Sequence, residues 1–202
     1  MNSKILIGAV IIVVVIAGAW FFTQGEKKEM TFSEGVNEIN LLWEKNNVNP
    51  KFLVADSTEA SFTASDLESL NNDLISFQDS LNKFNSTEET KALTDFVQIH
   101  FLLVDELVLA LETKNASDRL ELTEITGDNL CNNKTDLKLV GENTIKLNEK
   151  MSSVNELVYA FNEVHPNLEE TANLSSFIVS TADFSRIELE NTVMLNELER
   201  VC

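Results

Sequence analysis

The sequence predicts an all-α protein: an antiparallel up-down helical bundle of about four long helices plus short ones, behind one N-terminal transmembrane helix. Three observations predict this fold class. Gly and Pro, which β-rich folds need at their turns, number only six and two in 202 residues. Apolar residues recur at helical spacing along most of the chain. An uninterrupted apolar run opens the chain and covers residues 5–22.

The apolar run at residues 5–22 has the length of a membrane span. As a helix it would extend about 27 Å, close to the ~30 Å thickness of the hydrocarbon layer. Lys4 precedes it, and Trp20, Phe21 and Phe22 occupy the position of an interfacial aromatic belt. We therefore expect residues 5–22 to contact the membrane as an uncleaved anchor.

A cleaved signal peptide is the alternative for the same segment. Residues 17–19 read Ala-Gly-Ala, which fits a signal-peptidase site after a short apolar region, with cleavage near Ala19. The anchor predicts a single-pass protein of the cell membrane with an extracytoplasmic C-terminal domain, and cleavage predicts a secreted one. The expected organisation is an anchor or signal peptide at 1–24, a linker at 25–31 and a helical-bundle domain at 32–202.

The charge balance is strongly acidic. Asp and Glu number 33 against 15 Lys and Arg, which gives a formal charge of −18. Because no basic stripe could neutralise phosphates, nucleic-acid binding is excluded as a main function. The excess acid is interpreted as a dispersed, solvated surface.

Helix starts are predicted from capping boxes and the apolar periods that follow them. The boxes pair Thr31 with Glu34, Ser65 with Glu68 and Ser86 with Glu89. The predicted helices cover 32–46, 66–84, 88–113, 118–126 and 135–164, with a turn at 113–117. A last helix returns after Pro166 toward Cys202, with a break near 173–176 and Phe177, Ser180 and Phe184 on its apolar seam.

The two cysteines are predicted to form a disulfide. An exported chain meets oxidising conditions, and Cys131 and Cys202 are equally far from the helix breaker at Pro166. A helical hairpin about that proline brings both cysteines to one level and places Thr144 and Asn191 in one layer. Two unpaired, buried thiols are the alternative.

Motifs for catalysis, metals and cofactors are missing from the sequence. Paired Glu-x-x-His motifs, H-E-x-x-H, G-x-S-x-G, phosphate-binding glycine loops, EF-hand loops and C-x-x-C-H do not occur. Asp105 and Glu106 are not interpreted as a catalytic pair, because adjacent helical residues diverge by about 100°. We therefore expect no enzyme, no metal and no cofactor.

The sequence favours a non-catalytic protein that acts through protein–protein contact at the cell surface. Leu102 and Leu109 interrupt the polar stripe of the helix at 88–113 and are candidate partner-contact residues; the partner's identity is open, and a homo-oligomer is compatible with this. The competing expectation is that a short helix, 32–46 or 118–126, covers both leucines. The alternative function is small-ligand or cation binding in a pocket near His100, which otherwise reads as a core histidine.

Four Asn-x-Ser/Thr sequons complete the candidate sites. Chance alone yields about as many in a chain this rich in Asn, Ser and Thr, so they only weakly support surface loops or helix ends. The possible glycosylation sites are Asn85, Asn115, Asn133 and Asn173.

Overall fold

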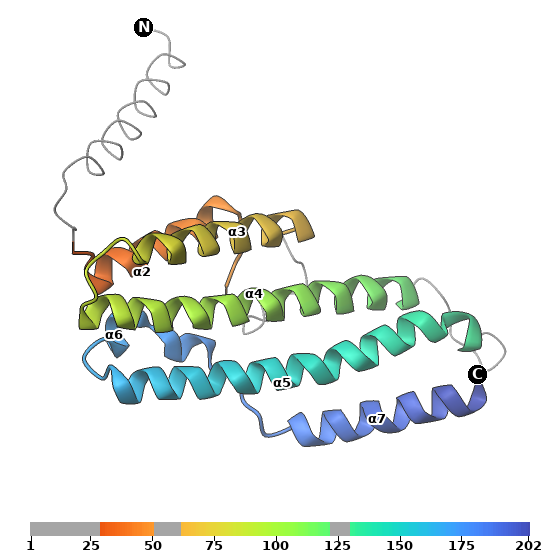
Figure 1. The fold of residues 1–202 in the computed structure, drawn as a ribbon. Helices are drawn as coiled ribbons and strands as arrows, with labels where there is room; N and C mark the ends of the chain where they lie inside the picture. The colour runs from red at the N-terminus through yellow and green to blue at the C-terminus, as the bar shows by residue number, and fades with distance from the viewer. Residues whose placement is uncertain (1–28, 51–61, 122–129) are drawn as a thin grey trace, which may run out of the picture.

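The computed structural model describes residues 29–50, 62–121 and 130–202, and each regular element found there is helical. The prediction of an all-α, bundle-like fold is confirmed. The four longest helices are α3, α4, α5 and α7, and they lie roughly parallel to one another across Figure 1. The elements are α2 (Phe32–Lys45), α3 (Ala64–Leu81), α4 (Glu88–Glu121), η1 (Leu130–Asn133), α5 (Lys134–Val164), α6 (Glu169–Ala172), η2 (Leu174–Phe177) and α7 (Phe184–Val201).

The N-terminal predictions concern a part of the chain that lies outside the described residues. The membrane segment 5–22, the alternative signal peptide and the cleavage near Ala19 all stay predictions. Of the helices in the described ranges, none is both long enough and apolar enough to cross a membrane.

The long helices are joined by contacts in sequence order: α3 packs on α4, α4 on α5, and α5 on α7. Side-chain contacts show that α4 and α5 run antiparallel along most of their length. A hydrogen bond joins His165 Nε2, directly after α5, to Asp95 (3.1 Å), and ion pairs join Lys150 to Asp105 (2.7 Å) and Arg119 to Asp136 (2.6 Å).

The hydrophobic core lies at one end of this layer. All members of the buried cluster fall between residues 32 and 107 or between 154 and 177. They come from α2, α3, the first part of α4, the last part of α5, α6 and η2, with Val48 after α2 and Phe62 before α3. We call these described residues the core end. Residues 108–121, 130–153 and 178–202 contribute no member to that cluster, and we call them the staple end.

The capping prediction is confirmed for α2 and wrong for α3. Thr31 and Glu34 form the expected reciprocal box at the start of α2. At α3 the box uses Thr63 and Asp66 instead of Ser65 and Glu68. The helix begins earlier because the Asp66 carboxylate accepts the Thr63 backbone N–H at 2.7 Å, and this shorter side chain was not considered as a partner.

The start of α4 also differs from the predicted Ser86–Glu89 box. Thr87 and Thr90 cap it reciprocally: the Thr90 N–H donates to Thr87 Oγ1 at 3.1 Å, and the Thr87 N–H donates to Thr90 Oγ1 at 2.8 Å. Glu89 is therefore released for a tertiary role. Its carboxylate accepts the Phe32 backbone N–H at 2.6 Å and satisfies a free donor at the start of α2.

The turn predicted at 113–117 is wrong, because α4 continues through it to Glu121. No Gly or Pro interrupts these residues, and local contacts favour the helix. Lys114 pairs with Asp118 at 2.7 Å, and Ala116 is fully buried. The predicted separate helix 118–126 is thus partly the end of α4, and its last residues lie outside the described ranges.

The last helix is shorter than predicted, because α7 begins only at Phe184. The expected break near 173–176 occupies the whole stretch from Leu168 to Asp183. Asn173 ends α6 in the left-handed conformation (φ 48°), and η2 then places Phe177 in the core end. Phe177 and Ser180 therefore do not belong to the seam of this helix. The path continues as a strap at residues 178–182, which is extended at Ile178 and turns into α7 from Thr181.

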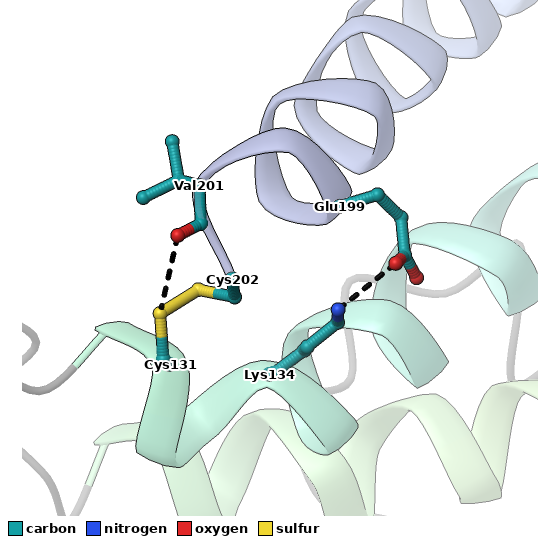
Figure 2. The surroundings of a disulfide bond; sticks show 5 residues. All are labelled: Cys131, Lys134, Glu199, Val201 and Cys202. Atoms are coloured by element: carbon teal, nitrogen blue, oxygen red, sulfur yellow. Dashed lines mark hydrogen bonds and ion pairs between the residues drawn. A yellow bond between two sulfur atoms is a disulfide. The ribbon is translucent and has the colours of Figure 1, made fainter.

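The predicted disulfide is present. Cys131 and Cys202 are bonded, with their Cα atoms 5.4 Å apart, at the joint end of α5 and α7 (Figure 2). Beside it, the Lys134 ammonium lies 2.9 Å from the Glu199 carboxylate. Both cysteines are exposed, so the alternative of two buried thiols is wrong.

The register of the α5–α7 hairpin agrees with equal arms about Pro166. Gly141 faces Met194 and Leu195 so closely that a Cβ on Gly141 would lie 2.7 Å from Met194 Cε. Thr144 and Asn191 consequently lie in one layer. Each, however, donates to a carbonyl of its own helix: Thr144 to Val140 at 2.7 Å and Asn191 to Ile187 at 2.8 Å.

Candidate functional site

A surface groove runs between α4 and α5 at the junction of the two ends of the molecule, with a volume of about 480 Å³. Its apolar surface exceeds its polar surface. We call it the α4–α5 groove, and it is lined by Leu102, Asp105, Val108, Leu109, Lys146, Glu149, Lys150 and Ser153.

Both predicted contact leucines line this groove. Leu102 and Leu109 are seven residues apart, so they lie on one stripe of α4, and both are half-buried. Val108 beside them is 38% exposed. α5 runs along one side of the leucines. The competing expectation of a cover by a helix at 118–126 is wrong as far as Glu121, because these residues continue α4. The leucines are therefore neither sealed in the core nor bare.

The charges at the groove come mainly from α5. Lys150 reaches across to Asp105 and closes one side of the groove with an ion pair. Lys146 and Glu149 are exposed and take part in none of the ion pairs found among the described residues. The walls therefore offer both signs of charge to a ligand or partner, on either side of an apolar floor.

Glu106 lies behind the groove and is buried. Only 3% of the residue is exposed, and its Oε1 has no hydrogen-bond partner among the described residues. Burial raises the pKa of Glu106 from 4.5 to about 8, and the Lys150 ammonium opposes part of that rise. The carboxyl is therefore mostly protonated at neutral pH, while Asp105 next to it is exposed.

The burial of Glu106 was missed from the sequence, although a signal existed. Glu106 follows Ile99 by seven residues and precedes Ala110 by four, and both of these are buried. The helical period thus placed it on the buried face of α4.

His100 is a core histidine in an aromatic setting. Its ring is 1% exposed and lies 4.5 Å from the ring of Phe96 and 6.0 Å from that of Phe177, centroid to centroid. Trp43 Nε1 donates to His100 Nδ1 at 2.9 Å, so the proton of the neutral ring sits on Nε2. Burial lowers the pKa of His100 from 6.5 to about 3.

Ligand binding at His100 has no support from the surrounding residues. Its Nε2 is buried without a partner in the described part of the chain, and His100 does not line the α4–α5 groove. No group of three or more His, Cys, Asp or Glu residues within the described ranges could hold a metal ion. The pocket near His100 stays a prediction.

Three of the four sequons lie where expected, at turns or element ends. Asn85 lies between α3 and α4, Asn133 ends η1, and Asn173 caps α6. Asn115 does not, because it is an exposed residue within α4. Glycosylation itself stays a prediction at all four positions.

Comparison with known proteins gives no relative: no family model matches the chain, and no curated protein or solved structure is significantly similar to it.

Proposed function

We propose that this chain is a non-catalytic, membrane-anchored, extracytoplasmic helical bundle that acts through protein–protein contact. The anchor is the predicted span at residues 5–22; cleavage near Ala19 would make the same domain a secreted one. The α4–α5 groove is the contact site, and its occupant is an amphipathic helix with basic flanks contributed by a partner protein.

The observation that carries this proposal is the pair of half-covered leucines between two antiparallel helices. Leu102 and Leu109 lie about 10 Å apart along α4, which is two helical turns. A third helix laid between α4 and α5 would cover both leucines and Val108 with apolar residues at helical spacing. An exposed apolar patch does not stabilise a monomer, whereas a protein–protein contact surface requires apolar residues that a partner can cover.

Charge favours a basic partner. In the groove lining, Asp105 and Glu149 are balanced by Lys146 and Lys150, so the preference comes from the charge of the whole chain. The whole chain carries −18, so an acidic helix would be repelled during approach and a basic one attracted. Glu149 is the exposed carboxylate of the groove wall and is the expected pairing group.

The test uses two synthetic amphipathic helices of about three heptads that share one leucine stripe. One carries lysine flanks and the other glutamate flanks, and each is labelled and titrated by fluorescence anisotropy against the full chain in phosphatidylcholine nanodiscs. We expect the lysine peptide to bind at least about tenfold more tightly, with an affinity that falls as salt rises.

Groove variants decide whether that binding is specific. Leu102→Glu with Leu109→Glu should abolish it while circular dichroism stays unchanged. The matched control is Leu189→Glu with Val193→Glu, which changes two exposed apolar residues of α7 that are 63% and 54% exposed. Equal loss of binding in both double variants, or none in the first, would show that the groove is not the site.

A further inference from the structure

A second hollow, of about 560 Å³, lies where the strap crosses α5. This volume falls within the range of roughly 300–1,000 Å³ that is typical of small-ligand sites. It belongs to a surface different from the α4–α5 groove and shares no residue with it. Its lining consists of Ser152, Asn155, Glu156 and Tyr159 of α5 and residues 178–182 of the strap.

Asn155 fixes the shape of this strap hollow. Its side-chain amide is buried and donates to the Val179 carbonyl at 2.8 Å, and its carbonyl oxygen accepts the Val179 N–H at 3.0 Å. This two-point clamp satisfies both polar groups of one strap residue, so the strap is held at a fixed distance from α5. The hollow is thus preformed.

The other polar side chains of the strap hollow are available to a ligand. The side chains of Ser152, Glu156, Tyr159, Ser180 and Thr181 take part in none of the hydrogen bonds or ion pairs found among the described residues. Tyr159 is the only tyrosine of the chain, and its side chain is 60% exposed at the edge of the hollow. An aromatic face, a carboxylate and several hydroxyls therefore converge on one space.

We propose that the strap hollow binds a neutral saccharide. Sugar hydroxyls each donate and accept a hydrogen bond, which matches the Ser and Thr hydroxyls, and a carboxylate such as Glu156 accepts two adjacent sugar hydroxyls. The C–H face of a pyranose packs on an aromatic ring, the role open to Tyr159. No Lys or Arg lines the hollow, so Glu156 disfavours phosphorylated or acidic ligands.

The test is saturation-transfer-difference NMR on the full chain in phosphatidylcholine nanodiscs, which avoid sugar-headed detergents. The probes are maltose, cellobiose, lactose and diacetylchitobiose, with methyl glucuronide as the acidic probe. We expect transfer to at least one neutral disaccharide, strongest to the C–H protons of one ring face, and markedly less transfer to the glucuronide.

Three variants and a control locate the binding. Tyr159→Ala should abolish the transfer, Tyr159→Phe should keep it, and Glu156→Gln should weaken the affinity about tenfold. Glu163→Gln, an exposed carboxylate of the same helix outside the hollow, is the matched control and should change nothing. The proposal is overturned if no neutral disaccharide receives transfer, if Tyr159→Ala leaves the transfer unchanged, or if the glucuronide alone receives it.

Discussion

The two ends of this molecule are held together by different forces. In the core end, large side chains such as Trp43, Phe96 and Leu70 are almost fully buried in one contiguous cluster. In the staple end, α7 buries only Leu198, and a disulfide joins Cys202, directly after α7, to Cys131. Because the staple end buries little apolar surface, its stability depends on the disulfide and on ion pairs.

Helix starts differ in the same way between the two ends. α2 and α3 begin with complete capping boxes, and α4 begins with the reciprocal Thr87–Thr90 bonds. α5 and α7 begin without a side-chain cap hydrogen bond. In the core end, capped helix starts and a buried apolar cluster therefore favour the same helices. The staple end has ion pairs such as Lys134–Glu199 instead, and each of these contributes little stability and weakens in salt.

The largest expected effect comes from opening a cavity in the core end. Phe96→Ala should lower the free energy of unfolding by about 3–5 kcal/mol, because the ring is 1% exposed and its neighbours cannot collapse into the space. Phe184→Ala, at the start of α7, is the matched control and should cost only about 1–2 kcal/mol, since its ring is half-buried. Urea unfolding measures both, and equal costs would break the comparison.

Removing the disulfide should act mainly on the staple end. Cys131→Ser with Cys202→Ser opens a loop of 71 residues and should cost about 2–4 kcal/mol. We expect hydrogen exchange to accelerate in α7 and the first turns of α5, and to stay slow in α3 and the first half of α4. Uniform acceleration over all helices would show that the two ends unfold as one unit.

Much of the fold was predictable because the helical period of apolar residues is a local property. The seam of α3, from Leu67 to Leu81, is buried as its spacing predicts. The disulfide was predictable because Cys131 and Cys202 are equally far from Pro166 in sequence. Since a helix rises by a fixed length per residue, two arms of equal residue number end at the same level. Neither inference needed tertiary information.

The features that sequence reasoning missed depend on contacts between distant residues. No residue close to Asn155 in the sequence indicates that its side-chain amide will bind the Val179 backbone. This contact holds residues 178–182 as a strap where the sequence predicted helix. Glu89 looked like part of a capping box and instead satisfies Phe32. The open side of Leu102 and Leu109 was likewise set by where α5 runs, which no local pattern encodes.

A smaller effect is expected from pH, through Glu106 at the boundary between the ends. Its pKa rises from 4.5 to about 8 on folding, so the stability contributed by the protonated carboxyl is complete below about pH 4.5 and is lost as pH rises through about 8. Wild-type stability should therefore fall by roughly 3–4 kcal/mol between pH 5 and 8 from this group. Glu106→Gln should remove that fall in urea titrations, whereas exposed Glu149→Gln should keep it.

His100 in the core end should give the opposite slope. Its pKa falls from 6.5 to about 3 on folding, so its contribution is present above pH 6.5 and is lost as pH drops toward 3. The Glu106→Gln variant should retain this acid-side loss. If the stability of Glu106→Gln still declined from pH 5 to 8, groups other than Glu106 would cause that decline.

The smallest effect concerns where α3 begins, and it tests whether capping matters more in the core end. Thr63→Ala removes the hydroxyl that accepts the Asp66 N–H and should cost about 1 kcal/mol. Ser65→Ala, at the position that the sequence favoured as the cap, should stay within about 0.5 kcal/mol of wild type.

Asp183→Ala at the start of α7 should also cost little, because Asp183 makes no cap bond and its ion pair with Arg186 is exposed. If Asp183→Ala proved as costly as Thr63→Ala, α7 would be stabilised by its own start, and the disulfide would not be its main tie to α5.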